Sequence, residues 1–272
     1  MDVVLGRFNA SLERPQTQKF AWPIILLPEL FSPLQHLVMV TGHLVSLGWE
    51  VYLLDVYGRM DGQHPKSNSQ ERSFSALFND IARALDTLGS DLVVTGHGFG
   101  GLLALKLAEI PRVRAAVALA PLTPGFQSPL LFRRKRWAPW RTEAILFPSP
   151  RVLLEFVNGA EPFQHEALTK SMVPSDVSAA LDVVHGVVQL ARQPTPRLII
   201  TGESDIFAPA EHAAQFATKI GAQFISLPGR GHWIIGGRTL ERTIALMQRF
   251  LVRSSGKELL LLYEESGGNV EQ

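Results

Sequence analysis

Short apolar runs alternate with amphipathic segments along most of this chain, and this rhythm limits the folds it can adopt. Apolar runs bounded by turn residues are typical of buried strands, and periods of three to four residues indicate helices. Strands that alternate with helices favour a parallel sheet with right-handed crossovers and helices on both faces. The predicted class is therefore α/β, with a doubly wound, mostly parallel sheet and a ligand site at the carboxyl edge of its strands. The expected strands cover 22–28, 50–56, 91–95, 113–121, 196–202 and 222–228, and the expected helices 33–48, 74–88, 102–110, 175–192, 209–220 and 239–252.

The rhythm breaks after the expected strand 113–121. The segment 122–193 is rich in proline and large aromatic residues and has one convincing helical pattern, at 175–192. We expect a helical cap or lid here, inserted into a core made of 1–121 and 194–252. The end of the chain, 253–272, is mostly polar and is expected to be a loosely held tail.

A glycine cluster lies where one expected strand meets the next helix, in "VVTGHGFGGLLALKLAEI" at 93–110. Its glycines fit the dinucleotide fingerprint G-x-G-x-x-G. That motif belongs in the first βαβ unit and needs an acid about 20 residues later. Here it follows the third expected strand, and 118–123 ("ALAPLT") holds no acid. A nucleotide site is disfavoured, and Gly96, Gly100 and Gly101 are interpreted as room for a tight turn.

The competing interpretation is a nucleophile elbow, G-x-S-x-G, with glycine in place of serine at position 98. An elbow of this kind requires an acid and then a histidine after later strands. Asp205 in "TGESDIFAP" and His232 in "LPGRGHW" follow the strands expected at 196–202 and 222–228. With "GHGFGG" at 96–101 and "DVYGRMDG" at 55–62, these motifs resemble the α/β-hydrolase fold superfamily, in order and spacing, over 22–252.

The resemblance implies a catalytic site without its nucleophile. Gly98 would hold the nucleophile position, Asp205 would orient the ring of His232, and that ring would be a general base near neutral pH. Asp205 could instead cap the helix that begins near Pro209. A Gly98→Ser variant is expected to melt slightly lower and to gain esterase activity.

The resemblance also implies an oxyanion hole made by the backbone N–H groups of Leu30 and Phe99. Related proteins usually have His-Gly where this chain has Pro28-Glu29. Glu29 therefore places a carboxylate near the point where negative charge would develop. His97 is expected to pack beneath the elbow, as a supporting residue.

The function remains open between classes at this stage. The chain resembles ester, thioester or lactone hydrolases but should be impaired as a serine hydrolase. One alternative is a non-covalent enzyme (water activation, C–C hydrolysis, lyase or cyclase) that uses His232 as its base. The other is a binding protein on a hydrolase scaffold, with a satisfied but inactive Asp205–His232 pair.

Composition excludes several other classes. Lys and Arg total 26 against 25 Asp and Glu, which gives no global charge for binding nucleic acid. The absence of cysteine excludes disulfides, thiolate catalysis and cysteine-bound metals. We expect no cofactor, no metal and no membrane span, and a cytoplasmic location.

The expected partner is a small apolar ester-like or acyl ligand. Within the insertion, "RRKRWAPW" at 133–140 joins four cations to two tryptophans. A solvated lid edge explains this run, as does a docking point for an acyl carrier or a CoA thioester through Arg133, Arg134, Lys135 and Arg136.

Overall fold

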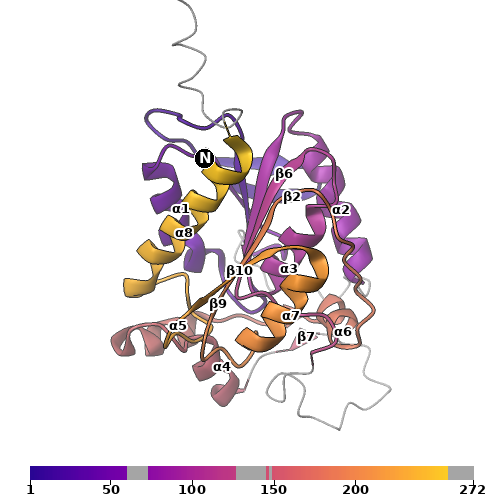
Figure 1. The fold of residues 1–272 in the computed structure, drawn as a ribbon. Helices are drawn as coiled ribbons and strands as arrows, with labels where there is room; N and C mark the ends of the chain where they lie inside the picture. Colours follow the sequence, from indigo (N-terminus) through magenta and orange to yellow (C-terminus); the bar gives the residue numbers. More distant parts are fainter. Residues whose placement is uncertain (60–72, 127–144, 147–148, 257–272) are drawn as a thin grey trace, which may run out of the picture.

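A mostly parallel sheet organises the computed structural model, which describes residues 1–59, 73–126, 145–146 and 149–256 (Figure 1). Its strand order is β1-β2-β4-β3-β5-β6-β9-β10. The pairs β1/β2 and β2/β4 are antiparallel, and every later pair is parallel. The strands are β1 (Asp2–Leu5), β2 (Phe8–Glu13), β3 (Ile24–Leu27), β4 (Val51–Leu54), β5 (Leu92–His97), β6 (Val113–Leu119), β9 (Arg197–Gly202) and β10 (Gln223–Leu227).

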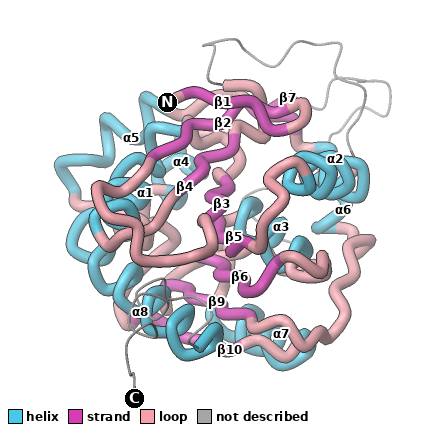
Figure 2. Tube along the Cα trace, turned by 90° about the horizontal axis from the view of Figure 1, so that it is seen from above, coloured by secondary structure: helices cyan, strands magenta, loops and turns pink. Residues whose placement is uncertain are grey.

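Helices cover both faces of the sheet, as Figure 2 shows from above. One face carries α1 (Val38–Ser46) and α8 (Gly237–Ser255), which contact each other. The other face carries α2 (Phe74–Asp86), α3 (Phe99–Leu107) and α7 (Ala210–Ile220). The central strands β3, β4 and β5 are buried at every residue, as expected when both faces of a parallel sheet are covered.

Local signals explain where these helices begin and end. Helix α2 buries an apolar stripe that includes Phe74, Leu77 and Ile81. The side chain of Ser73 caps it by accepting a hydrogen bond from the N–H of Ala76 at 3.1 Å. Helix α7 ends at Gly221, whose left-handed conformation (φ 73°) suits glycine.

The insertion between β6 and β9 contains several short elements instead of one long helix. They are α4 (Pro150–Phe156), the 3₁₀ helix η2 (Pro162–Gln164), α5 (His165–Ser171), α6 (Ser178–Val184) and the small pair β7 (Ile145–Leu146) and β8 (Ser175–Asp176). The helix expected over 175–192 is therefore wrong in extent. Helix α6 packs on α2, which ties the insertion to the core.

The predicted α/β class, the parallel sheet and each of the expected core strands are confirmed, within a few residues at their ends. The hairpin β1/β2 was missed, although the burial of Phe8, Ala10 and Leu12 alternates as a strand should. The helix expected from an N-cap at Ser32 begins instead as the 3₁₀ turn η1 (Leu34–Leu37), with Pro33 at its N-cap. No helix in the described ranges is long and apolar enough to cross a bilayer.

Candidate active site

Position 98 is the sharp bend between β5 and α3. Gly98 is the N-cap residue of α3, with φ 53° and ψ −116°, a conformation that favours glycine. Its N–H donates to the carbonyl of Leu119 at 2.8 Å, and its own carbonyl accepts from Leu102. A Cβ at Gly96 or Gly100 would collide with neighbouring backbone, which agrees with the steric interpretation of both glycines.

The predicted acid and histidine are paired. Nδ1 of His232, in the loop after β10, lies 2.9 Å from Oδ2 of Asp205, in the loop after β9. Oδ1 of Asp205 accepts from the N–H groups of Phe207 and Ala208 at 2.8 and 2.9 Å. The N-cap of α7 is Pro209, so Asp205 fixes the loop before the helix and does not cap it.

Glu29 occupies the space beside Gly98. It follows β3, and its carboxylate points at the elbow, where a Cβ on residue 98 would overlap Oε2. Oε1 accepts hydrogen bonds from the N–H groups of Leu30 (2.5 Å) and Phe99 (3.1 Å), and Oε2 lies 3.0 Å from the same Phe99 nitrogen. These are the two N–H groups expected to form the oxyanion hole. The carboxylate of Glu29 therefore fills the space beside Gly98 and binds both N–H groups to which the resemblance assigned the oxyanion hole.

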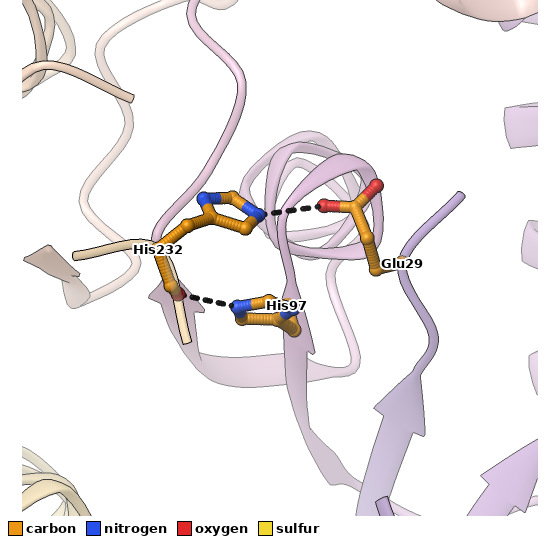
Figure 3. Close-up of side chains that lie close together, drawn as sticks. All are labelled: Glu29, His97 and His232. Atoms are coloured by element: carbon orange, nitrogen blue, oxygen red, sulfur yellow. Dashed lines mark hydrogen bonds and ion pairs between the residues drawn. The ribbon is translucent and has the colours of Figure 1, made fainter. Parts of the chain in front are cut away.

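The carboxylate of Glu29 also faces the ring of His232 (Figure 3). Oε2 of Glu29 lies 3.4 Å from Nε2 of His232. Glu29, Asp205 and His232 are 2, 3 and 1% exposed, so their charges interact with little screening by water. The order Glu29–His232–Asp205 therefore replaces the Ser–His–Asp order that an elbow serine would complete.

Charge keeps the ring of His232 protonated. Burial alone favours the neutral ring, but the charge and hydrogen bond of Asp205, together with the charge of Glu29, raise the pKa of His232 to about 10. At neutral pH the site holds an imidazolium between two carboxylates. In this protonated state His232 cannot accept a proton. The resting site therefore disfavours His232 as the general base in the first step of a reaction.

His97 lies behind this array. Its Nε2 is 3.0 Å from the carbonyl oxygen of His232, and the two rings are 4.7 Å apart. Burial, followed by the charge of His232, holds the pKa of His97 well below its usual range. The neutral ring then donates from Nε2 and supports the histidine loop, in the place expected from the sequence.

Glu29, His97 and His232 also form the one group in the described part of the chain whose ligand atoms, all within 4.8 Å of one another, could hold a metal ion. Two histidines and a carboxylate suit zinc or iron. The carboxylate, however, is already held by the two backbone N–H groups and by the ring of His232. We therefore interpret the group as an internally paired site.

Arg59 and Ser175 fix the loop that carries Glu29. The guanidinium of Arg59 donates to the carbonyls of Glu29 and Ser32 and to Oγ of Ser175. Oγ of Ser175 in turn accepts from the N–H of Phe31 at 2.8 Å. Phe31 has a positive φ of 60°, an unfavourable conformation for a residue with a Cβ. The insertion, through Ser175, thus helps to hold Glu29 against the elbow.

Comparison with known proteins identifies the family. Residues 20–245 match the sequence model of a family described as the alpha/beta hydrolase family. The chain belongs to the alpha/beta hydrolase family. No curated protein matches its sequence significantly.

Several solved structures share the fold. A monoacylglycerol lipase from Paleococcus ferrophilus is 18% identical, with a TM-score of 0.69 over 90% of this chain and 99% of the lipase. A thermophilic esterase from Thermogutta terrifontis is 16% identical, with a TM-score of 0.66 over 93% and 99%. The enol-lactonase from Burkholderia xenovorans is 19% identical, with a TM-score of 0.63 over 94% and 100%. At these identities the likeness establishes the fold alone.

In this alpha/beta hydrolase, the expected site residues meet at the carboxyl ends of β3, β5, β9 and β10. Sequence reasoning put Glu29 beside the oxyanion hole but missed that its carboxylate fills it. It also missed Arg59, although that residue lies within "DVYGRMDG". The four cations Arg133, Arg134, Lys135 and Arg136 lie outside the described residues.

Aromatic rings enclose the histidine. Phe156 of the insertion and Phe207 stand edge-on to the ring of His232, with centroids 5.4 and 5.2 Å away. Phe156 stacks on Phe207 at 4.4 Å and contacts Phe31. This apolar surrounding excludes water from the carboxylate and the imidazolium, which strengthens their interaction.

Proposed function

We propose that this alpha/beta hydrolase has lost the serine route and hydrolyses its substrate through the carboxylate of Glu29. In this proposal Gly98 leaves space for the carboxylate of Glu29, Glu29 is the nucleophile, and His232, oriented by Asp205, transfers protons. A substrate of ester, thioester or lactone type could then react only slowly by the serine pathway, because deletion of a triad serine removes on the order of 10⁶ in turnover.

One observation carries the proposal. The carboxylate of Glu29 lies in the space that an elbow side chain would fill, and Oε2 is 3.4 Å from Nε2 of His232. A carboxylate is an established covalent nucleophile in enzymes. This position supports Glu29 as the nucleophile, next to the ring that would exchange protons with the reacting groups.

His232 has a defined task in this scheme. Once Glu29 becomes covalently bound, its negative charge disappears and one of the groups that raise the pKa of His232 is removed. The ring can then release its proton and activate water against the covalent intermediate. In the resting ion pair His232 therefore cannot act as a base, and it becomes one only after Glu29 has reacted.

Trapping the intermediate tests the proposal. His232→Ala should allow Glu29 to react but block hydrolysis, so that mass spectrometry of the peptide containing Glu29 finds a covalent adduct after exposure to reactive acyl and alkyl probes. Glu29→Gln should abolish the adduct. Glu166→Gln, which changes an exposed glutamate paired with Lys170, is the matched control and should keep it. EDTA should not alter labelling.

The absence of an adduct and of turnover would point to a non-catalytic protein. A folded His232→Ala variant that carries no adduct on Glu29 with any probe, and a parent protein without turnover, would overturn the proposal. They would favour a binding protein in which Glu29 and His232 form a structural ion pair.

A further inference from the structure

From a cavity beside helix α7 we infer a second binding site, which takes a small amphipathic carboxylate with an apolar, ring-containing body. The cavity has a volume of about 290 Å³, at the lower end of the range typical of small-molecule sites. It lies on the face of the sheet that also carries α2 and α3 (Figure 2). None of Glu29, Gly98 and His232 is among its described lining residues, so the inference does not depend on the proposed function.

Three segments of the chain form the walls of this cavity. They are the turn at 123–126 after β6, the segment at 188–190 that leads from α6 to β9, and one side of α7. Helix α7 contributes four residues, spaced so that their side chains share one side of the helix. These residues are His212, Gln215, Phe216 and Lys219. The cavity therefore extends along the helix.

Hydrogen bonds hold the two non-helical walls in place. In the turn, the N–H of Phe126 donates to the carbonyl of Thr123 at 3.1 Å, and Gly125 has the φ of 79° that the third position of a type II turn requires. In the segment before β9, the carbonyl of Gln189 accepts from Nζ of Lys106 at 2.9 Å. The protein itself fixes both walls, which lowers the entropic cost of binding a ligand between them.

One end of the cavity is aromatic. The rings of Phe126 and His212 lie 4.6 Å apart near the start of α7. Phe216, Val188 and Leu190, all buried, add apolar surface to the walls. This part of the cavity suits a ring or a short hydrocarbon chain, because burial of apolar surface is favourable.

The other end of the cavity is positively charged. Lys219, in the last turn of α7, has no ion-pair partner among the described residues. Arg192 lies at the same end of the helix, where its Nε would be 2.8 Å from a Cβ on Gly221. No acidic residue is among the described residues that line the cavity. The carbonyl end of the helix carries about −0.5 elementary charge, less than the two cations supply, so this end favours an anion.

The distance between these two ends sets the length of the ligand. His212 and Lys219 are seven residues apart, which is about 10 Å along a helix that rises 1.5 Å per residue. A phenyl ring joined to a carboxylate through a short alkyl chain spans a similar distance.

Thr123 offers a further polar contact. It lines the same cavity, and its buried hydroxyl has no hydrogen-bond partner among the described residues. Buried polar groups are normally paired, so a hydroxyl or carbonyl oxygen in the body of the ligand would complete this wall.

Binding of 4-phenylbutyrate to the full chain tests the inference, with 4-phenylbutan-1-ol as a neutral probe of the same chain length. In an NMR titration the carboxylate should shift the backbone amides of 123–126, 188–190 and α7, with a Kd of about 1 mM or tighter. The alcohol should bind about 10-fold more weakly, because it cannot form an ion pair with Lys219. Lys219→Met, which keeps an unbranched apolar side chain, should remove this difference. Lys170→Met, which changes an exposed lysine on α5, is the matched control and should keep it.

A second readout comes from filling the cavity. Gln215→Trp introduces a large ring from an exposed position on α7 and should weaken the binding of both probes. Thr218→Trp, exposed on the same helix but outside the cavity, should leave their binding unchanged. Amide shifts confined to the surroundings of His232, or no shifts from the carboxylate at millimolar excess, would overturn the site. Equal affinities of the two probes for the parent protein would overturn the ligand class.

Discussion

Oε2 of Glu29 and Nε2 of His232 face each other at 3.4 Å in a site that excludes almost all solvent. This pair makes the charge state of one residue depend on the other. Removal of the negative charge in Glu29→Gln should lower the pKa of His232 from about 10, because burial favours the neutral ring and Asp205 alone remains to oppose it. NMR titration of the imidazole measures the shift, with Glu166→Gln as a control that leaves it in place. An unchanged titration in folded Glu29→Gln would show that the two groups do not interact.

The same ion pair predicts how stability depends on pH. The pKa of His232 is raised in the folded chain, so its contribution to stability is complete below about pH 6.5 and is lost as the pH rises towards 10. One proton changes the free energy of unfolding by at most about 1.4 kcal/mol per pH unit. Urea unfolding at pH 6, 8 and 9.5 should show this decline, and a folded His232→Ala variant should show less of it. Parallel declines in both proteins would contradict the assignment.

Serine at position 98 should not restore an esterase by itself, which revises the prediction made from the sequence alone. In Gly98→Ser the new Cβ would overlap Oε2 of Glu29 at a residue with φ 53°, so the fold should lose stability and the oxyanion donors should stay blocked. The double variant Glu29→Gly/Gly98→Ser vacates the hole and supplies the hydroxyl. Hydrolysis of p-nitrophenyl acetate should therefore be faster in the double variant than in either single variant, and should disappear when His232→Ala is added. Equal rates in the single and double variants would mean that Glu29 does not block the hole.

The predictions from the sequence are correct for the elements that a single local pattern determines. The buried strands β3, β5 and β9 are continuous apolar runs, and Asp205 and His232 follow strands at spacings that the family resemblance fixes. The position of the Glu29 carboxylate depends instead on Arg59 and Ser175, which come from distant parts of the chain. No local pattern encodes such a contact. The insertion was misjudged for the same reason, since its described α-helices α4, α5 and α6 have seven residues each and depend on packing.

Gly100 tests the steric interpretation of the glycine cluster. A Cβ there would lie 2.5 Å from the carbonyl oxygen of Leu27 in β3, so Gly100→Ala must push helix and strand apart. We expect it to lower the free energy of unfolding by about 1–3 kcal/mol. Gly42→Ala is the control, because it lies within α1 with nothing within 4 Å, and it should stabilise by up to about 1 kcal/mol. Equal effects of the two substitutions on urea unfolding would refute the close approach at Gly100.

Arg59 should act as a positioning residue for Glu29. Arg59→Ala removes the donors to the carbonyls of Glu29 and Ser32, and leaving buried carbonyls unpaired should cost about 1–3 kcal/mol. Hydrogen exchange at the amides of Leu30 and Phe31 should become faster, and the pKa of His232 should fall as Glu29 moves away. Arg238→Ala, which removes an exposed partner of Glu161, should change none of these readouts. A loss of stability without a change at His232 would limit Arg59 to a structural role.

The overlap between residue 98 and the Glu29 carboxylate has a consequence for how such a protein can diverge. A side chain at 98 and the Glu29 carboxylate in its present position exclude each other, so a relative that carries both serine and glutamate must turn the glutamate side chain away from the elbow. Relatives that keep the present arrangement are therefore expected to carry glycine at 98, and relatives with serine there to carry a smaller residue or a displaced glutamate at 29.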